Sequence, residues 1–99
     1  MTTNQGTFWR DASDRLTFAI FDLDSACYPE FCQKLVEKFS LIPSSELIVG
    51  LDVMFRDYTD GVLTVGLEWD IWSGFIVTAK QKDAELLVRN IAIFLSEIQ

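Results

Sequence analysis

Residues 47–80 read LIVGLDVMFRDYTDGVLTVGLEWDIWSGFIVTAK. Apolar and polar residues alternate with a period of two over residues 47–58, 62–71 and 75–80, which predicts three β-strands. Two turn-forming triplets, Thr59-Asp60-Gly61 and Trp72-Ser73-Gly74, separate these segments. Because connections this short join neighbouring strands that run in opposite directions, the stretch predicts a three-stranded antiparallel meander.

The lengths of the two loops decide which side chains share a face of the predicted sheet. A two-residue loop at Asp60-Gly61 would pair Phe55 with Gly66 and mix core and solvent positions. A three-residue loop from Thr59 to Gly61 avoids this mixing and gives Gly61 the left-handed position that glycine favours. With three-residue loops at both turns, one face is apolar throughout. Its members are Val49, Leu51, Val53, Phe55, Leu63, Val65, Leu67, Trp69, Phe75 and Val77.

Three further elements flank the meander. A strand is predicted over residues 16–21, and a helix follows Pro29 because apolar residues recur at helical spacing from Cys32 to Phe39. A second helix is predicted over residues 83–98 by the same spacing. The order β-α-β-β-β-α predicts an α+β two-layer sandwich, with both helices on one face of an antiparallel sheet. We expect residues 1–99 to form a single domain in which residues 1–13 are loosely ordered.

The composition limits the classes of protein. Hydrophobic residues make up 49% of the 99 residues, enough to bury a core without disulfides or metal. Because Cys27 and Cys32 are only two soft ligands and histidine is absent, we predict no metal site and no Ser/His or Cys/His nucleophile. No cofactor is expected. The chain has no apolar run of about 20 residues and no signal-peptide pattern, so we expect a cytoplasmic protein without membrane contact.

Negative charge is concentrated in the meander. The formal net charge is −7, and residues 46–79 hold six acidic residues and one arginine, so five of the seven net charges lie there. This balance argues against direct nucleic-acid binding, which needs Lys and Arg to displace counterions from phosphate. A concentrated field of one sign instead attracts basic partners and speeds association.

The predicted register gathers three of these acids on the solvent face. Asp52 would lie directly across from Glu68, with Asp70 as a diagonal neighbour, and opposed like charges cost a few tenths to about 1 kcal/mol. Such a face is either simply solvated or a binding surface, and the sequence leaves both open. Three carboxylates could also hold a divalent cation, but an open sheet offers no enclosing loop. Trp72 begins a turn and is expected to be exposed. The predicted partner-binding residues are Asp52, Asp57, Tyr58, Glu68, Asp70 and Trp72.

Residues 18–25, FAIFDLDS, resemble the first motif of the haloacid-dehalogenase-like phosphatases, an apolar strand that ends in Asp-x-Asp. The resemblance implies a nucleophile at Asp22 and a general acid/base at Asp24. The family's usual Gly-Thr is replaced by Ser25-Ala26, and the meander replaces the family's parallel sheet. We therefore predict that the chain is not an enzyme, and a phosphatase remnant is the least favoured reading.

The size, acidity and α+β layout, together with the segment GLEWDIWSGF at residues 66–75, resemble the small immunity proteins of bacterial toxin systems, including contact-dependent growth inhibition. Those families bind a toxin, often a basic nuclease, in the cytosol and block it. If the chain has this role, the charges of Asp52, Asp57, Glu68 and Asp70 suit pairing with the toxin's Lys and Arg, and Tyr58 and Trp72 suit apolar contacts; this assignment follows from side-chain chemistry and not from the family. The alternative is a small acidic secretion chaperone or adaptor, which would show an exposed apolar groove and form a dimer.

Overall fold

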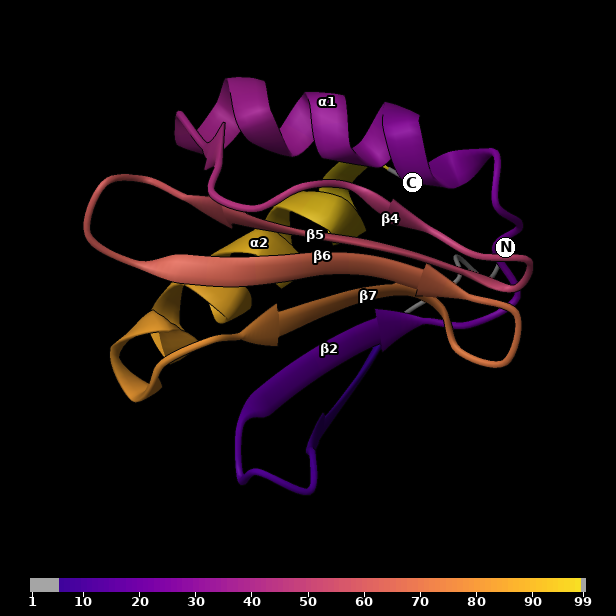
Figure 1. Ribbon diagram of the computed structural model, residues 1–99. Helices are drawn as coiled ribbons and strands as arrows, with labels where there is room; N and C mark the ends of the chain where they lie inside the picture. Colours follow the sequence, from indigo (N-terminus) through magenta and orange to yellow (C-terminus); the bar gives the residue numbers. More distant parts are fainter. Residues whose placement is uncertain (1–5, 99) are drawn as a thin grey trace.

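The computed structural model describes residues 6–98, which form one antiparallel sheet and two α-helices (Figure 1). The predicted α+β class is confirmed, with the sheet as the larger part. The elements are β1 (Thr7–Arg10), β2 (Leu16–Ile20), α1 (Cys27–Phe39), β3 (Ile42–Pro43), β4 (Ile48–Val49), β5 (Val53–Thr59), β6 (Thr64–Asp70), β7 (Gly74–Ala79), the 3-10 turn η1 (Lys82–Ala84) and α2 (Glu85–Ile98).

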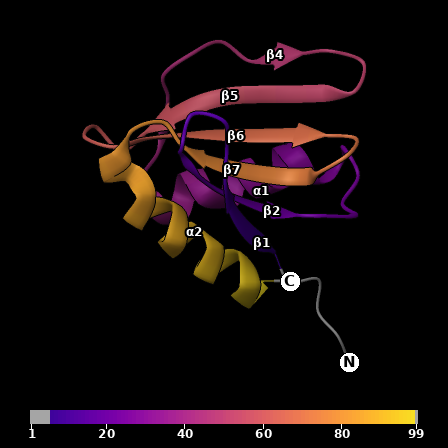
Figure 2. The same ribbon diagram turned by 90° about the horizontal axis from the view of Figure 1, so that it is seen from below.

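The sheet has the strand order β1-β2-β7-β6-β5-β3, and β4 also pairs with β5. All of these pairings are antiparallel. The predicted meander is therefore the centre of the sheet, and β2 extends it beside β7. On the other side of β5, the short strands β3 and β4 form an interrupted edge. Figure 2 shows β4 beside β5.

Both helices pack on one face of the sheet. Buried side chains of α1 and α2 form a single core with alternate residues of the central strands, such as Val65, Leu67 and Val77. The helices also meet each other, because the rings of Phe39 and Phe94 pack edge to face with centroids 5.9 Å apart. Burial of these alternating apolar positions is the main source of stability.

Two buried aromatic side chains connect the layers through hydrogen bonds. The Tyr28 hydroxyl in α1 donates to the carbonyl oxygen of Leu67 at 2.6 Å, and Trp69 Nε1 donates to that of Leu23 at 2.8 Å. Each aromatic polar group thus has a partner inside the core, as buried polar atoms require. Trp69 is 8% exposed, so its predicted core position is confirmed.

The predicted register between β5 and β6 is wrong. The strands are joined by a four-residue loop, 60–63, so Thr59 pairs with Thr64 and Tyr58 with Val65. Asp60 explains the longer loop, because its Oδ1 accepts the backbone N–H groups of Val62 at 2.9 Å and of residue 63 at 2.8 Å. Because side chains alternate along a strand, the extra residue moves every side chain of β5 to the face opposite the predicted one.

This reversal changes the composition of the core. On β5, Tyr58 is 7% exposed and faces the helices, whereas the predicted core residue Phe55 is exposed. Leu51 and Val49 are exposed as well. The apolar face predicted for residues 49–55 is therefore wrong, while the predicted faces of β6 and β7 are correct.

The second turn differs from the prediction by one position at each end. Its loop is 71–73, so Trp69 pairs with Phe75 and Asp70 with Gly74. Gly74 has φ +71° and an added Cβ would lie 2.1 Å from the carbonyl oxygen of Ile20, so the position requires glycine. The pairing moves by two residues in total, which leaves every β6 and β7 side chain on its predicted face.

Part of the segment expected to be loosely ordered forms a strand. β1 pairs with β2 along its whole length, from Thr7 opposite Ala19 to Arg10 opposite Leu16. Residues 1–5, which belong to the same prediction, lie outside the described residues. The N-terminal hairpin extends the sheet beyond β2.

Candidate functional site

The face of the sheet opposite the helices contains a cavity of about 370 Å³, which we call the acidic groove. Its lining includes Trp9, Asp11, Thr17, Glu68, Asp70, Thr78 and Lys80. These residues come from β1, β2, β6, β7 and the segments that adjoin them. The N-terminal hairpin forms one wall of this hollow, because Trp9, Asp11 and Thr17 are among its lining residues.

Two threonines lie side by side on the floor of the groove. Thr17 of β2 pairs with Thr78 of β7, and the two residues are 3% and 6% exposed. The Thr17 hydroxyl donates to the carbonyl oxygen of Arg15 at 3.3 Å. No residue among 6–98 makes a hydrogen bond with the Thr78 hydroxyl. Every fully enclosed polar side-chain atom of these residues does have a partner, so the Thr78 hydroxyl is not fully enclosed. The Thr78 hydroxyl therefore opens into the groove.

Glu68 is the carboxylate least satisfied by its surroundings. It is half-buried, and no described residue makes a hydrogen bond or a close ion pair with its carboxylate. Burial raises the pKa of Glu68, and the nearby charges of Asp57, Asp70 and Asp11 raise it further, while Lys80 lowers it. The net effect is a raised pKa of Glu68, of which burial is the largest cause.

Lys80 supplies a positive charge inside this cluster. Its Nζ lies 3.5 Å from Asp57 Oδ1, and its side chain passes over Gly66 of the central strand. A Cβ at position 66 would lie 2.7 Å from Lys80 Cε and 3.1 Å from a Glu68 oxygen. The glycine thus leaves the space through which Lys80 reaches Asp57.

Two other acids of the groove also hold its walls in place. Asp70 Oδ1 accepts the backbone N–H groups of Trp72 at 3.0 Å and Ser73 at 2.6 Å, which fixes the turn after β6. Asp11 Oδ1 accepts those of Ser13 at 2.8 Å and Arg15 at 3.0 Å. Carboxylates are common in such turns because they accept from nearby backbone donors. These two acids therefore have structural roles whatever else they do.

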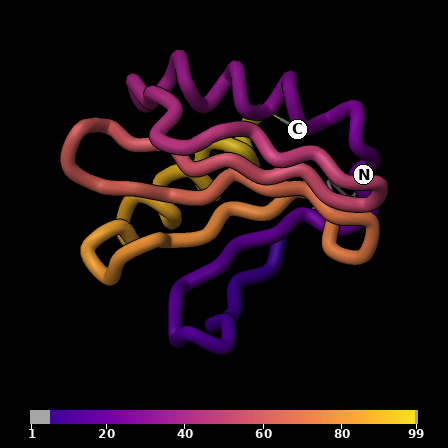
Figure 3. Tube along the Cα trace, viewed as in Figure 1, coloured from indigo at the N-terminus to yellow at the C-terminus, as the bar shows by residue number. Residues whose placement is uncertain are grey.

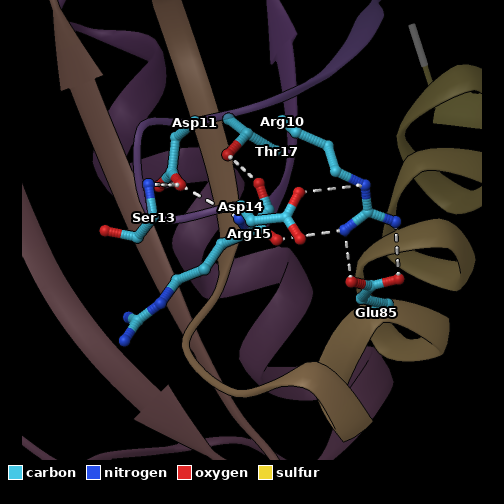
Figure 4. Close-up of polar contacts among 7 residues, drawn as sticks. All are labelled: Arg10, Asp11, Ser13, Asp14, Arg15, Thr17 and Glu85. Carbon is cyan, nitrogen blue, oxygen red and sulfur yellow. Dashed lines mark hydrogen bonds and ion pairs between the residues drawn. The ribbon is translucent and has the colours of Figure 1, made fainter.

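An ion pair holds the N-terminal hairpin against α2, as Figure 4 shows. The Arg10 guanidinium donates to both carboxylate oxygens of Glu85, at 2.6 and 3.0 Å, and to the Asp14 carbonyl oxygen at 3.2 Å. The hydrogen bond to Glu85 is the main cause that raises the pKa of Arg10, and in turn it lowers that of Glu85. This bidentate contact fixes the loop that contributes Asp11 to the groove.

The structure places the predicted binding residues in different parts of the molecule. Asp57, Glu68 and Asp70 lie together on the open face, in or beside the groove. Asp52 is in an exposed turn where its carbonyl oxygen accepts the N–H of residue 71 at 3.0 Å, and Phe55 takes the place opposite Glu68 that was predicted for Asp52. The predicted place of Asp52 opposite Glu68 is therefore wrong.

The two predicted aromatic contacts have different positions. Tyr58 lies in the core on the helix side, so its predicted place on the open face is wrong. Trp72 is 78% exposed, as expected for a residue in a turn. With Leu51 and Ile71 it forms an exposed apolar surface at the end of the sheet where turns 50–52 and 71–73 adjoin (Figure 3), which we call the apolar tip.

Sequence reasoning missed the threonine floor and the hairpin wall. A signal for the floor exists, because Thr17 and Thr78 are the polar members of the otherwise apolar segments LTFAI and FIVTA. Trp9 and Asp11 had no such signal, since their position depends on β1.

The residues of the phosphatase-like motif are not part of the groove. Asp22 and Asp24 follow β2 and are exposed, and Asp24 Oδ1 accepts the N–H of Ala26 at 3.1 Å before α1. Within residues 6–98, no three Cys, Asp or Glu side chains are arranged to hold a metal ion. Cys27 and Cys32 are free and buried, and burial raises the pKa of each thiol to about 11. Neither helix of the described chain is long and apolar enough to cross a membrane.

Comparison of the chain with protein-family models found no match, and comparisons with curated proteins and with solved structures found no significant match either.

Proposed function

We propose that this protein binds a basic protein domain through the acidic groove and neutralises it, as an immunity protein of a toxin system. The observation that supports this role best is the state of Glu68. Its carboxylate is half-buried among three other acids, and no described residue donates a hydrogen bond to it. A cationic partner would relieve this repulsion, and complementary charge both speeds encounter and selects the partner.

The apolar tip would complete the interface. Asp70 belongs to the groove and also fixes the turn that holds Trp72, so the charged and apolar parts are joined by one short segment. Tryptophan is among the residues most enriched at binding hot spots, and charged contacts around it exclude water. The proposed contact surface therefore combines the groove, Asp57 and the apolar tip. On this proposal the chain acts by covering the toxin and performs no catalysis.

A second candidate function is a secretion chaperone or adaptor, which a different cavity favours. A mainly apolar hollow of about 380 Å³ lies between α1 and the β4–β5 edge, and Cys32, Val36, Leu47 and Met54 are among its lining residues. An apolar segment of another protein would suit this hollow. We favour the toxin inhibitor because the acidic groove has unsatisfied polar groups, which apolar segments cannot relieve.

The test uses the reading frame directly upstream of that for this chain, which we expect to encode an exported protein. Its C-terminal domain is expressed in bacteria with and without this chain, and growth is measured. We expect growth to stop with the domain alone and to recover with the wild-type chain. The immunity role is wrong if the chain does not restore growth.

Charge variants then locate the interface on the purified proteins. Glu68→Lys is expected to weaken binding by at least about 2 kcal/mol, because it leaves partner charges unpaired. Glu46→Lys is the matched control, since Glu46 is exposed and distant in sequence from the groove strands. Calorimetry measures both affinities, and circular dichroism checks folding. If Met54→Glu abolished binding while Glu68→Lys did not, the chaperone reading would be favoured instead.

A further inference from the structure

The acidic groove has the dimensions of a site for one side chain. Its volume of about 370 Å³ lies near the lower end of the roughly 300–1,000 Å³ range of small-ligand pockets. Such a space admits one long side chain. A single projecting residue of a partner can therefore enter the groove.

The polar groups of the groove select a cation with several donors. The Glu68 carboxylate receives no hydrogen bond from the described residues. The hydroxyl of Thr78, which is 94% buried, makes none with them either, and both residues line the groove. Thr78 pairs with Gly66, while Glu68 pairs with Ile76, so Thr78 and Glu68 are diagonal neighbours on adjacent strands. Diagonal neighbours are within reach of one long side chain.

These observations favour guanidinium over ammonium. Two cations of the chain line the groove, but Lys80 reaches Asp57 at 3.5 Å and neither Lys80 nor Arg15 makes a hydrogen bond to Glu68, so its carboxylate keeps free acceptor positions. A planar guanidinium has five N–H donors in a rigid fork, so it can satisfy a carboxylate and a neighbouring hydroxyl together. It also stacks on aromatic faces. Trp9 lines the groove and is held by stacking on Phe21, with centroids 6.2 Å apart.

We infer that the acidic groove is an arginine site, in which one arginine side chain of the partner protein bonds to Glu68 and Thr78 beside Trp9. The inference rests on the proposed function, because it takes the bound arginine to be part of a partner protein. The neighbouring apolar tip supports that source, since a free small molecule would leave Leu51, Ile71 and Trp72 uncovered. Asp70 and Asp11 contribute negative charge while they keep their bonds to the turns.

The experiment is an NMR titration of the uniformly ¹⁵N-labelled full chain with N-acetyl-arginine N-methylamide. Matched titrations use the lysine analogue and the citrulline analogue, which keeps the shape of arginine without its charge. We expect saturable shifts of the Glu68 and Thr78 amide signals with arginine. Binding should be at least tenfold weaker with lysine and undetectable with citrulline. Equal affinity for arginine and lysine, or shifts confined to other parts of the chain, would overturn the inference.

Two substitutions test the named contacts. Glu68→Gln removes the charge, and Thr78→Val removes the hydroxyl with little change of shape. Each should weaken arginine binding at least fivefold, whereas Glu46→Gln should leave it unchanged. An unchanged affinity in Glu68→Gln overturns the arginine site. The two proposals fail separately: arginine binding without growth rescue removes only the immunity role, and growth rescue without arginine binding removes only the arginine site.

Discussion

Lys80 lies across Gly66 and brings its Nζ to 3.5 Å from Asp57 Oδ1. A cation from the end of β7 therefore lies among the acids of the open face, and it is the nearby charge that lowers the pKa of Glu68. The free protein thus reduces the repulsion within its own groove, but Glu68 still has a raised pKa. Changes at Lys80 and Gly66 should alter the groove without touching the core.

Replacing Lys80 by Gln should raise the pKa of Glu68 further, because a positive charge near a carboxylate favours its ionised form. Carboxyl ¹³C chemical shifts followed against pH measure this directly. Lys82→Gln is the control, since Lys82 is exposed on η1. Gly66→Ala should act in the same direction as Lys80→Gln, because the new methyl group would displace Lys80 Cε. A lower Glu68 pKa in Lys80→Gln would contradict the described arrangement.

Glu68→Gln should stabilise the fold at neutral pH. A carboxyl whose pKa is raised on folding binds its proton more tightly in the folded state than in the unfolded state. The Glu68 carboxylate therefore does not destabilise the wild-type fold below its ordinary pKa of 4.5. The destabilisation grows as the pH rises through the raised pKa. Urea unfolding at pH 7 should give a higher free energy for the variant than for the wild type.

The same comparison at about pH 3.5 should give little difference, because Glu68 is then protonated in both states. Glu46→Gln serves as the control at both pH values. A variant that is less stable than the wild type at pH 7 would show that the charge of Glu68 is compensated in the free protein.

Asp70→Ala should destabilise the fold by about 1–3 kcal/mol, because two backbone N–H groups lose a charged acceptor. Asp70→Asn should cost less, since its amide oxygen can accept the same two bonds. Urea unfolding distinguishes the two variants. Equal stability of both variants and the wild type would contradict a structural role for this carboxylate. Binding experiments therefore need Glu68 variants, which leave the turn intact.

Gly74→Ala should destabilise the fold by about 3 kcal/mol or more. The residue has φ +71°, and its new Cβ would meet the backbone of Ile20, which cannot move aside without disturbing β2. Gly61→Ala is the matched control, because Gly61 has φ +103° but open space around it. We expect a loss of about 1–2 kcal/mol there, from backbone conformation alone. Thermal unfolding of both variants checks the ranking, which a larger loss at Gly61 would contradict.

The sequence was sufficient for the class of fold and for the central strands. Alternation identified β6 and β7 and placed Trp69 in the core, because a strand buried on one face must repeat every second residue. The reversal of β5 escaped prediction because Asp60 stabilises a loop one residue longer than the glycine position suggested. One residue in one loop was enough to move Tyr58 from solvent to core.

The acidic residues of the candidate site could be predicted from the sequence, but the hollow that they line could not. Glu68 and Asp70 were assigned to one face, and they do lie together there, whereas Asp57 joins them only because β5 is reversed. The hollow depends on the N-terminal hairpin, which alternation cannot predict. Trp9 and Asp11 reach the groove because β1 pairs with β2, and the contact of Arg10 with Glu85, 75 positions away, holds this hairpin against α2. Such distant pairings leave no local pattern in a sequence.

The interruption between β3 and β4 has a consequence for self-association. A long, flat outer strand offers a row of free N–H and C=O groups to which a second chain can add. Here the outer position beside β5 is divided into two pieces of two residues each, and Pro43 in the first has no N–H to donate. This margin of the molecule is therefore a poor template for polymerisation through added strands.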